Sequence, residues 1–257
     1  MCLILFAHQV HPDYPLILAG NRDEFCDRPT NVAEFWGESP DLLAGRDLLG
    51  GGTWLGITRS GRLATVANFR HPAEFHRPGL SRGGLTVDFL RSEVPVLSYL
   101  ETVARQADRY KGFNLLVGDR SSLCFYSNRE KIIRLLPPGI YGLSNALLDT
   151  PWPKVVQGKT ALASLLAAGP LTPEDLLAIL ADTSRPPDEQ LPDTGIGLAR
   201  ERLLSSRFIA AADYGTRAST VILLDRTNQV TFVERTFDCT PARWRDTRHQ
   251  FRLSPGN

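Results

Sequence analysis

The chain has 257 residues, of which 42% are hydrophobic and 22% are charged, and its formal net charge is +1. This length suits one large domain or two small ones. The nearly neutral charge is a poor match for a polyanion, so we expect no nucleic acid among its partners. No apolar run approaches the ~20 residues that a bilayer-spanning helix needs, and the N-terminus lacks the basic region of a signal peptide. We therefore expect no integral membrane segment.

The first half of the chain has mainly the pattern of β-structure. Two short apolar segments flank the turn-forming residues 11–15 and predict an opening hairpin. Helical spacing of apolar residues follows later and predicts two helices. The expected strands are 3–7, 16–20, 53–58, 62–68, 113–118, 123–127, 132–136 and 140–143, and the expected helices are 81–90 and 96–107.

The second half begins with helices and ends with a hairpin. One helix is expected over 159–168, and Thr172-Pro173 opens another with a capping hydroxyl and a proline in the first turn. A loop over 185–197, a charged helix from about 199, a hairpin of 220–224 with 229–234, and a basic, flexible tail from about 240 complete the chain. No repeat or change in composition marks a boundary, so we expect a single domain over 1–257. The hairpin connections favour an α+β fold with antiparallel sheets.

The second residue of the chain is a cysteine. Because methionine is removed efficiently before a small side chain, the mature protein can begin at Cys2 and carry a thiol and a free α-amine on one residue. Their ordinary pKa values, about 8.5 and about 7.7–8.0, make this residue a nucleophile joined to its own general base. The other cysteines, Cys26, Cys124 and Cys239, form no CxxC pair, which argues against a zinc knuckle or a disulfide framework. We expect a reducing, cytoplasmic location.

Two further motifs have simple structural interpretations. His71 and His76 are separated by a spacing, with a proline, that does not place both imidazoles on one helical face, so we expect no metal site there. The triple glycine at 50–52 is followed by a strand and not by a helix, so we interpret it as a tight turn and not as a phosphate loop. No cofactor is predicted.

Polar side chains at strand ends are the candidate partners of Cys2. In the Asn-Arg-Asp-Glu tetrad at 21–24, an arginine can lower a thiol pKa and a carboxylate can orient an α-amine; alone, the tetrad is also typical of a solvated turn with ion pairs. Asn68 and Asn145 offer neutral donors to an oxyanion, although asparagine is also a common turn residue. Arg217, at the final hairpin, offers a second guanidinium.

Taken together, these segments resemble the NRDE family, whose eukaryotic members include the transport and Golgi organisation protein 2. The resemblance follows the family's order and extends to about residue 234. Its segments are 1–2, 21–24, 51–56, 67–70, 142–145, 151–154, 191–197 and 214–220.

The family in turn is similar to the N-terminal nucleophile (Ntn) hydrolases, especially the cysteine branch of bile-salt hydrolases, penicillin V acylases and acyl-CoA-dependent acyltransferases. That resemblance implies a four-layer αββα sandwich and an acyl-enzyme mechanism. It implies that Cys2 is the nucleophile and that Arg22 and Asp23 are the arginine and the acid near the thiol. It also implies that Asn68 and Asn145 are the oxyanion donors and that Arg217 is the second arginine. One departure is that the arginine and the aspartate are adjacent here, whereas they are a few residues apart in the hydrolases.

The leading hypothesis is an Ntn-type cysteine hydrolase or acyltransferase acting on a non-peptide amide or thioester of a small molecule. The alternative is a non-catalytic binder or carrier of haem, lipid or acyl-CoA on the same fold, with Cys2 or His8 as a ligand, although no CxxCH motif supports covalent haem. A third interpretation is a structural cysteine in a core strand. The substrate and the oligomeric state are left open.

Overall fold

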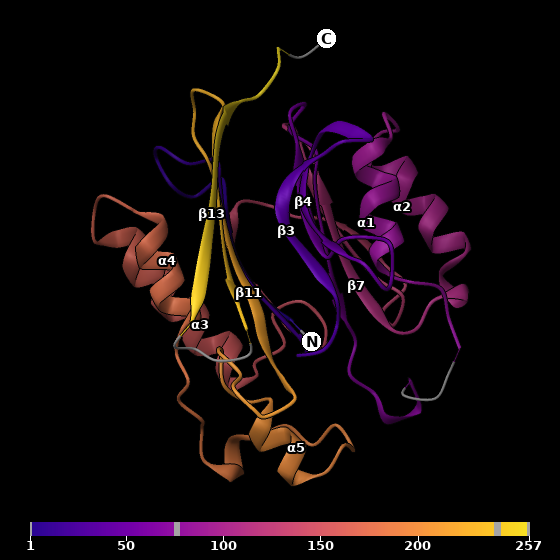
Figure 1. Cartoon of the computed structure of the whole chain (residues 1–257), viewed down its shortest axis with the longest axis vertical. Helices are drawn as coiled ribbons and strands as arrows, with labels where there is room; N and C mark the ends of the chain where they lie inside the picture. The colour runs from indigo at the N-terminus through magenta and orange to yellow at the C-terminus, as the bar shows by residue number, and fades with distance from the viewer. Residues whose placement is uncertain (1, 75–77, 239–242, 256–257) are drawn as a thin grey trace. The chain divides into compact units, whose positions relative to one another are not determined.

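Two antiparallel sheets organise the structure, a computed structural model that describes residues 2–74, 78–238 and 243–255. Each sheet is the centre of one of two compact units of the chain (Figure 1). The first unit comprises residues 1–27, 70–72 and 138–250, and the second comprises residues 28–69, 73–137 and 251–257.

The first unit contains a six-stranded sheet with helices on one face. The strand order is β10 (Gly139–Leu143), β1 (Cys2–His8), β2 (Leu16–Phe25), β11 (Tyr214–Leu224), β12 (Gln229–Phe237) and β13 (Trp244–Arg252). Its helices are α3 (Pro153–Ala167), α4 (Pro173–Leu180) and the short α5 (Leu198–Leu203), with a 3₁₀ turn at Asp188–Gln190. Alternate side chains such as Leu5 and Ile17 pack against Val155 and Leu176 of α3 and α4.

The opening hairpin of this unit is as predicted, with Cys2 opposite Arg22 and His8 opposite Leu16. The helix predicted from Thr172 also forms, and Thr172 and Asp175 make a capping box at its start. Helix α3 begins earlier than the predicted residue 159, because Pro153 occupies its first turn and has the backbone angle that a helix start requires.

The second unit contains a seven-stranded sheet covered by two helices. The strand order is β3 (Thr30–Trp36), β4 (Ser39–Asp47), β5 (Leu55–Thr58), β6 (Leu63–Asn68), β7 (Phe113–Gly118), β8 (Leu123–Ser127) and β9 (Ile133–Leu135). The helices are α1 (Gly83–Arg91) and α2 (Val96–Arg105), and 3₁₀ turns lie at Pro72–Glu74 and Ala107–Arg109. The triple glycine forms the predicted tight turn, since a side chain at Gly52 would lie only 2.4 Å from the backbone of Gly83.

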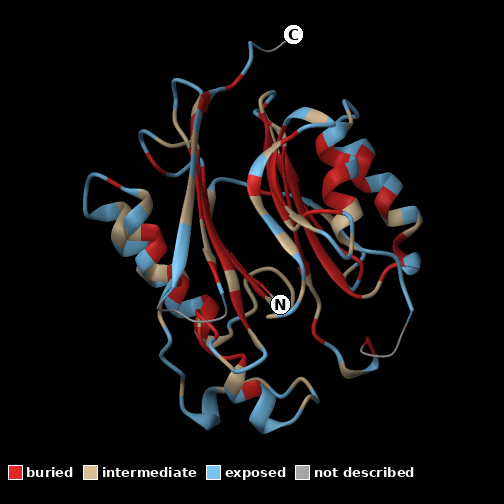
Figure 2. Cartoon of the chain, viewed as in Figure 1, coloured by how far each residue is buried: buried red, intermediate tan, exposed pale blue. Residues whose placement is uncertain are grey.

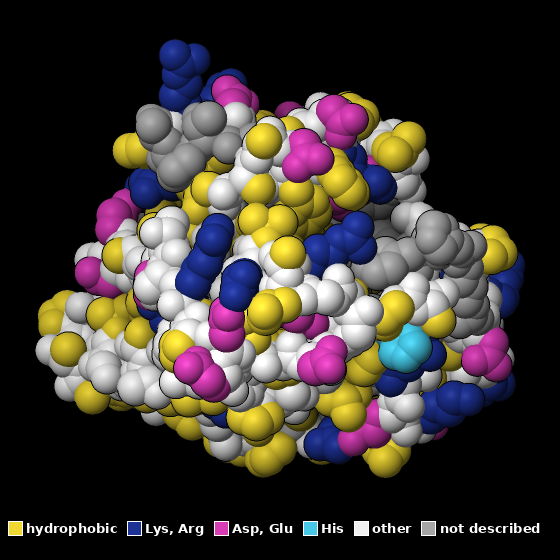
Figure 3. Space-filling model, turned by 90° about the horizontal axis from the view of Figure 1, so that it is seen from below, with side chains coloured by type: hydrophobic (Ala, Val, Ile, Leu, Met, Phe, Trp, Pro, Cys, Tyr) yellow, Lys and Arg dark blue, Asp and Glu magenta, His cyan; other side chains and the backbone are white. Residues whose placement is uncertain are grey.

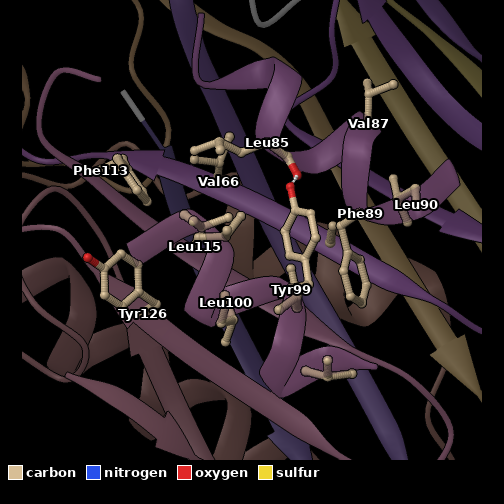
Figure 4. Close-up of a cluster of buried hydrophobic side chains, with 14 of the residues drawn as sticks. Val66, Leu85, Val87, Phe89, Leu90, Tyr99, Leu100, Phe113, Leu115 and Tyr126 are labelled. Atoms are coloured by element: carbon tan, nitrogen blue, oxygen red, sulfur yellow. Dashed lines mark hydrogen bonds between the residues drawn. The ribbon is translucent and has the colours of Figure 1, made fainter. Parts of the chain in front are cut away.

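The core of the second unit lies between this sheet and helices α1 and α2. Figure 2 shows buried residues concentrated in the central strands and on the inner sides of the helices. Phe89, Tyr99 and Phe113 contribute large side chains to it, and the Tyr99 hydroxyl donates a 2.6 Å hydrogen bond to the Leu85 carbonyl (Figure 4). The polar end of this ring is therefore satisfied inside the core.

Three strands were not predicted from the sequence. β3 and β4 pair with two irregularities of register, which break the alternation of apolar residues that identifies a strand. β13 replaces the basic, flexible tail expected from about residue 240. Its side chains are mostly exposed, and Arg235 of β12 binds Asp246 of β13 at 2.8 Å. Charged residues are typical of an exposed edge strand, so composition alone suggested a tail.

Candidate functional site

Cys2 begins strand β1 and is buried. Arg22 lies directly opposite it on β2, so the two side chains share one face of the sheet. On the other side, the hydroxyl of Ser144 donates a 3.1 Å hydrogen bond to the Cys2 carbonyl. Because Ile4 pairs with Leu143 at the end of β10, Ser144 and the residue after it continue alongside the start of β1.

Burial raises the pKa of the Cys2 thiol above its ordinary value, and the nearby Asp23 carboxylate raises it further. The Arg22 guanidinium and a hydrogen bond from the Asp23 backbone act in the opposite direction. A thiol in this environment is a neutral hydrogen-bond donor until a neighbouring group accepts its proton.

Asp23 is fully buried next to Cys2. Burial raises the pKa of its carboxyl group, whereas Lys154, the Thr216 hydroxyl and Arg70 lower it. Thr216 donates a 2.8 Å hydrogen bond to Asp23 Oδ1, and the hydroxyl of Tyr214 donates to the Asp23 carbonyl at 3.0 Å. Alternation along β2 places Asp23 on the sheet face that carries α3 and α4, opposite to the face of Arg22. Arg22 and Asp23 lie on opposite faces of the sheet, and both nevertheless influence the pKa of the Cys2 thiol.

Sequence analysis did not identify the charged residues around Asp23. Lys154, in the first turn of α3, is buried and donates a 2.9 Å hydrogen bond to the Leu204 carbonyl. Arg70 and Glu201 form a buried ion pair at 2.6 Å. The family resemblance was the available sequence signal for Arg70 and Lys154, because these residues lie within its segments 67–70 and 151–154. Glu201 lies in a helix whose composition indicated exposure, so nothing in the sequence marked it.

Asn145 is fully buried, and its carbonyl accepts a 2.7 Å hydrogen bond from the Arg70 backbone. Its side-chain oxygen accepts from the Ser144 hydroxyl at 3.3 Å, and the same hydroxyl contacts Cys2. Asn145 thus lies beside the start of β1, and its role as an oxyanion donor stays a prediction. Asn68 ends strand β6 opposite Phe113 and belongs to the second unit. Its role at the Cys2 site stays a prediction.

Arg217 lies at a bulge in β11. Thr216 pairs with Asp23 and Ala218 pairs with Arg22, so Arg217 is the extra residue between them. Its guanidinium donates 2.8 Å hydrogen bonds to the carbonyls of Phe25 and Cys26. Burial and the charge of Arg22 lower its pKa. Arg217 thus lies near the predicted site and fixes the end of β2.

The structure corrects one expectation about the cysteines. Cys26 is disulfide-bonded, although the spacing of the cysteines argued against disulfides. Cys2 and Cys124 are free, and Cys239 lies outside the described residues. Sequence spacing identifies only local cysteine motifs, so a pairing between distant segments gives no such signal.

No cluster of three or more metal-binding side chains occurs among residues 2–74, 78–238 and 243–255. His71 is described, but His76 lies outside the described residues, so the expected absence of a metal site at this pair of histidines stays a prediction. His8 and Cys2 occupy opposite ends of β1, about 20 Å apart at the usual rise of a strand. They are too distant to bind one haem iron together.

No helix in the described part of the chain is long and apolar enough to cross a membrane. On the face of the molecule in Figure 3, acidic and basic side chains are mixed with hydrophobic ones.

Two solved structures share this fold at low sequence identity. The Caenorhabditis elegans ortholog of N-acylethanolamine-hydrolyzing acid amidase matches with a TM-score of 0.52 at 11% identity, over 86% of this chain and 92% of that one. The C2A mutant of conjugated bile acid hydrolase from Clostridium perfringens matches with a TM-score of 0.55 at 7% identity, over 100% and 98%. These matches confirm the predicted fold class, the α+β fold of antiparallel sheets found in Ntn hydrolases.

Comparison with full-length relatives identifies the family. The Transport and Golgi organization protein 2 homologs of Bos taurus and Homo sapiens are 42% and 39% identical, each over 98% of this chain and 99% of the relative. The Drosophila melanogaster protein of that name is 30% identical over 92% of both chains. The model of the Transport and Golgi organisation 2 family matches residues 1–239. This chain therefore belongs to the Transport and Golgi organisation 2 family.

Proposed function

We propose that the protein is an Ntn-type cysteine hydrolase or acyltransferase acting on a non-peptide amide or thioester of a small molecule. The observation that carries the proposal is the surroundings of Cys2: a free, buried cysteine with Arg22 opposite and Asp23 beside it. The two similar structures belong to proteins named as an amidase and a bile acid hydrolase, and the name of the second includes a replacement of a cysteine at its position 2. The first name supports hydrolysis of an amide, and the second supports a cysteine at position 2 of a hydrolase.

The proposed reaction has two steps. The Cys2 thiolate attacks the acyl carbonyl carbon, a C–S bond forms, and the carbonyl oxygen becomes an oxyanion that Asn145, and by the sequence prediction Asn68, stabilise by hydrogen bonds. The tetrahedral intermediate collapses, the C–N or C–S bond to the leaving group breaks, and the leaving group takes the thiol proton by way of the base. Water or an acceptor amine then attacks the thioester, which releases the acyl group and returns a proton to the sulfur.

The base in this scheme is the α-amine of Cys2, which exists only after Met1 is removed. Arg22 stabilises the thiolate, Asp23 orients the amine, and Arg217 holds the end of β2 in place. The intact mass of the purified protein tests this requirement directly. A protein that retains Met1 contradicts the amine mechanism.

Trapping of the acyl-enzyme tests the reaction class. The acyl donors to compare at pH 7–9 are p-nitrophenyl acyl esters of increasing chain length, N-acylethanolamines, a glycine-conjugated bile acid and acyl-CoA. An accepted donor adds its acyl mass to the peptide that contains Cys2. Release in buffer alone identifies a hydrolase, and faster release with an added amine identifies an acyltransferase.

Cys124 provides the matched control, because it is also free and buried but lies in the second unit. Cys2→Ala should abolish the adduct and the turnover, whereas Cys124→Ala should retain both. Turnover that survives in Cys2→Ala contradicts the proposal, as does a wild-type Cys2 that no activated donor acylates.

The carrier function is the alternative. We propose it second, because Cys2 and His8 cannot share one iron across the length of β1. Haem titration of the purified protein checks it: a Soret shift that is lost in Cys2→Ala favours the carrier.

We also propose a cytoplasmic location, where Cys2 remains a thiol. The disulfide at Cys26 is more typical of an oxidising compartment. Rapid alkylation of thiols in intact cells decides between the two, since a Cys26 that is alkylated before reduction is consistent with the cytoplasm.

A further inference from the structure

The hydroxyl of Ser144 contacts both the nucleophile residue and the predicted oxyanion donor. It lies 3.1 Å from the Cys2 carbonyl oxygen and 3.3 Å from Asn145 Oδ1. Ser144 and Asn145 are buried, and all three residues belong to the first unit. One small polar group therefore connects the residue that attacks the acyl carbonyl in the proposed reaction with a residue that stabilises the oxyanion.

A bend in the chain makes this geometry possible. Strand β10 ends at Leu143, and the chain bends over residues 144–147. In a straight strand the side chains of successive residues point to opposite faces, so Ser144 and Asn145 could not meet there. The bend brings the two side chains within hydrogen-bond distance of each other. The pairing of Leu143 with Ile4, immediately before the bend, keeps both residues beside the start of β1.

The single hydroxyl proton of Ser144 is shared between two acceptors. A serine has one O–H donor, and both distances exceed the usual length of an O–H···O bond, about 2.7–2.8 Å. This is the geometry of a three-centre hydrogen bond, in which one proton lies between two oxygen atoms. The Cys2 carbonyl and the Asn145 side chain are therefore held close to each other by the same group.

The backbone of Asn145 is fixed separately, from the segment after β6. The Arg70 amide donates a 2.7 Å hydrogen bond to the Asn145 carbonyl. Arg70 is itself held in place, since its guanidinium binds Glu201 at 2.6 Å and lies 4.7 Å from the centre of the Trp152 ring. With the backbone anchored in this way, the contact with Ser144 acts on the orientation of the side-chain amide.

The orientation of this amide decides what it can do for an oxyanion. The oxygen of an asparagine side chain accepts hydrogen bonds, and its nitrogen donates them in a different direction. A donor at Oδ1 keeps the oxygen of Asn145 toward Ser144 and turns the NH₂ group away from it. The same hydrogen bond polarises the amide, which strengthens the NH₂ group as a donor. Both effects favour a preorganised donor, the property that stabilises a developing oxyanion.

We propose that Ser144 is a positioning residue of the Cys2 site. Its hydroxyl holds the Asn145 amide in the orientation that presents the NH₂ group to the oxyanion, and it ties that amide to the backbone of the nucleophile. Ser144 acts through Asn145 and does not touch the substrate. This inference rests on the proposed function, and it deepens that function by assigning how one oxyanion donor is oriented.

Two reagents that need the same thiolate, but differ in the oxyanion, test the inference. With p-nitrophenyl acetate, the Cys2 thiolate adds to the carbonyl carbon, an oxyanion forms, and p-nitrophenolate leaves. With iodoacetamide, the thiolate displaces iodide from a saturated carbon, and no oxyanion forms. Both rates are measured on the full-length protein between pH 6 and pH 10, by mass spectrometry of the Cys2 peptide. The pH profile of alkylation gives its midpoint, and the ratio of acylation to alkylation cancels the thiolate fraction.

Loss of the hydroxyl should lower acylation alone. Removal of an oxyanion donor costs on the order of 10²–10³-fold in rate, and we expect loss of its positioning residue in Ser144→Ala to cost less, about tenfold in the ratio. The alkylation midpoint should stay the same. Ser144→Thr keeps the hydroxyl and should keep a ratio near that of wild type. If Ser144→Ala does not fold, Ser144→Val compared with Ser144→Thr gives the same test, because valine has the shape of threonine without its hydroxyl.

A matched serine and a double variant separate positioning from packing. Ser127 is buried in the second unit, and its hydroxyl donates to the Phe113 carbonyl at 3.1 Å, so Ser127→Ala should leave the ratio unchanged. Asn145→Ala should lower the ratio about a hundredfold. Ser144→Ala should add nothing in that background, since coupled residues are not additive. An unchanged ratio in folded Ser144→Ala, or a further tenfold loss in the double variant, overturns the inference.

The outcomes also distinguish this inference from the proposed function. A ratio that falls in Ser144→Ala, together with an acetyl group that neither water nor an amine removes from wild-type Cys2, supports the positioning role and contradicts the enzyme. Turnover of an acyl donor, together with a ratio that is the same in wild type and Ser144→Ala, supports the enzyme and contradicts the positioning role.

Discussion

The two units follow the same plan, an antiparallel sheet with two main helices packed on one face, yet they bury different side chains. The core of the second unit is a cluster of aliphatic and aromatic residues, and Glu74 is the one buried charged residue among those described there. The first unit has an apolar core between its sheet and α3 and α4. The charged residues that it also buries are Arg22, Asp23, Arg70, Lys154, Glu201 and Glu234.

This difference separates what folds the chain from what prepares it for chemistry. Burial of apolar surface stabilises either unit, whereas a buried ion pair contributes little net stability and often less than an apolar replacement of the same shape. A concentration of buried charges in one unit is therefore better explained by the site beside it, because perturbed groups cluster at functional sites. The comparison predicts that mutations of similar severity have different consequences in the two units.

The largest effect on stability is expected in the apolar core of the second unit. Phe113 is fully buried, and its ring lies 5.8 Å from that of Tyr110. It lies 5.9 Å from the ring of Tyr126 (Figure 4). Phe113→Ala removes these contacts and leaves a cavity, so it should lower the free energy of unfolding by about 3–5 kcal/mol. Urea denaturation measures the loss. Alkylation of Cys2 in the folded variant should not change, and a changed rate would show that the two units do not behave separately.

The next effect comes from the charge cluster. Glu201→Gln leaves the buried Arg70 guanidinium without its counter-charge, so we expect a loss of about 3 kcal/mol in the free energy of unfolding. Glu74→Gln is the matched change in the second unit. Its partner Arg129 is half-exposed, and solvent screens that pair, so the loss there should be about 1 kcal/mol. Equal losses in the two variants would remove the distinction between the units.

The sequence predicted the periodic parts of this structure well. The opening hairpin and helices α1, α2 and α4 were expected because apolar spacing, turn residues and capping signals act over a few neighbouring residues. Strands β3, β4 and β13 were missed, since irregular register and exposed charges weaken the same signals. A local sequence pattern predicts a helix or a strand only where the strand register and the burial of side chains are regular.

The site was predictable only in part. The pairing of Cys2 with Arg22 follows from a hairpin that the sequence already indicated. The burial of Lys154 near Asp23, and of Glu201 against Arg70, depends on how α3 and α5 pack, and no short-range pattern encodes that arrangement. The disulfide at Cys26 was missed for the same reason.

The stability of the protein at alkaline pH isolates the contribution of Lys154. Burial lowers the pKa of Lys154 from its ordinary value of 10.5 to about 8 in the folded protein, so between these values the folded state binds fewer protons than the unfolded state. Stability contributed by this residue therefore rises as pH increases from about 8 to about 10.5. The full rise is on the order of 3 kcal/mol, from the size of the shift.

Because Cys2 and the buried tyrosines also titrate at high pH, the quantity to measure is the difference between wild type and Lys154→Met. Urea denaturation of both at pH 7.5 and pH 10 gives it. We expect wild type to gain stability relative to the variant as the pH rises. A difference that does not vary with pH contradicts a lowered lysine pKa.

The smallest effect concerns one hydroxyl in each unit. Thr216 donates to Asp23 at 2.8 Å in the first unit, and in the second the Thr86 hydroxyl lies within hydrogen-bond distance of the carbonyls of Thr53 and Gly83. Both hydroxyls are buried, so Thr216→Val and Thr86→Val should each lower the free energy of unfolding by about 1–3 kcal/mol, the usual result of removing a donor from a buried acceptor. The two variants are thus matched in chemistry, burial and expected loss of stability.

They should differ at Cys2. The Thr216 hydroxyl lowers the pKa of Asp23, so its removal raises that pKa further and favours the neutral carboxyl group. A less charged Asp23 repels a thiolate less, and we expect the alkylation midpoint of Cys2 to fall slightly in Thr216→Val and to stay unchanged in Thr86→Val. A midpoint that rises in Thr216→Val would mean that Asp23 acts on Cys2 mainly through the position of its backbone amide and not through its charge. The direction of this small shift therefore identifies how the buried carboxylate acts on the thiol.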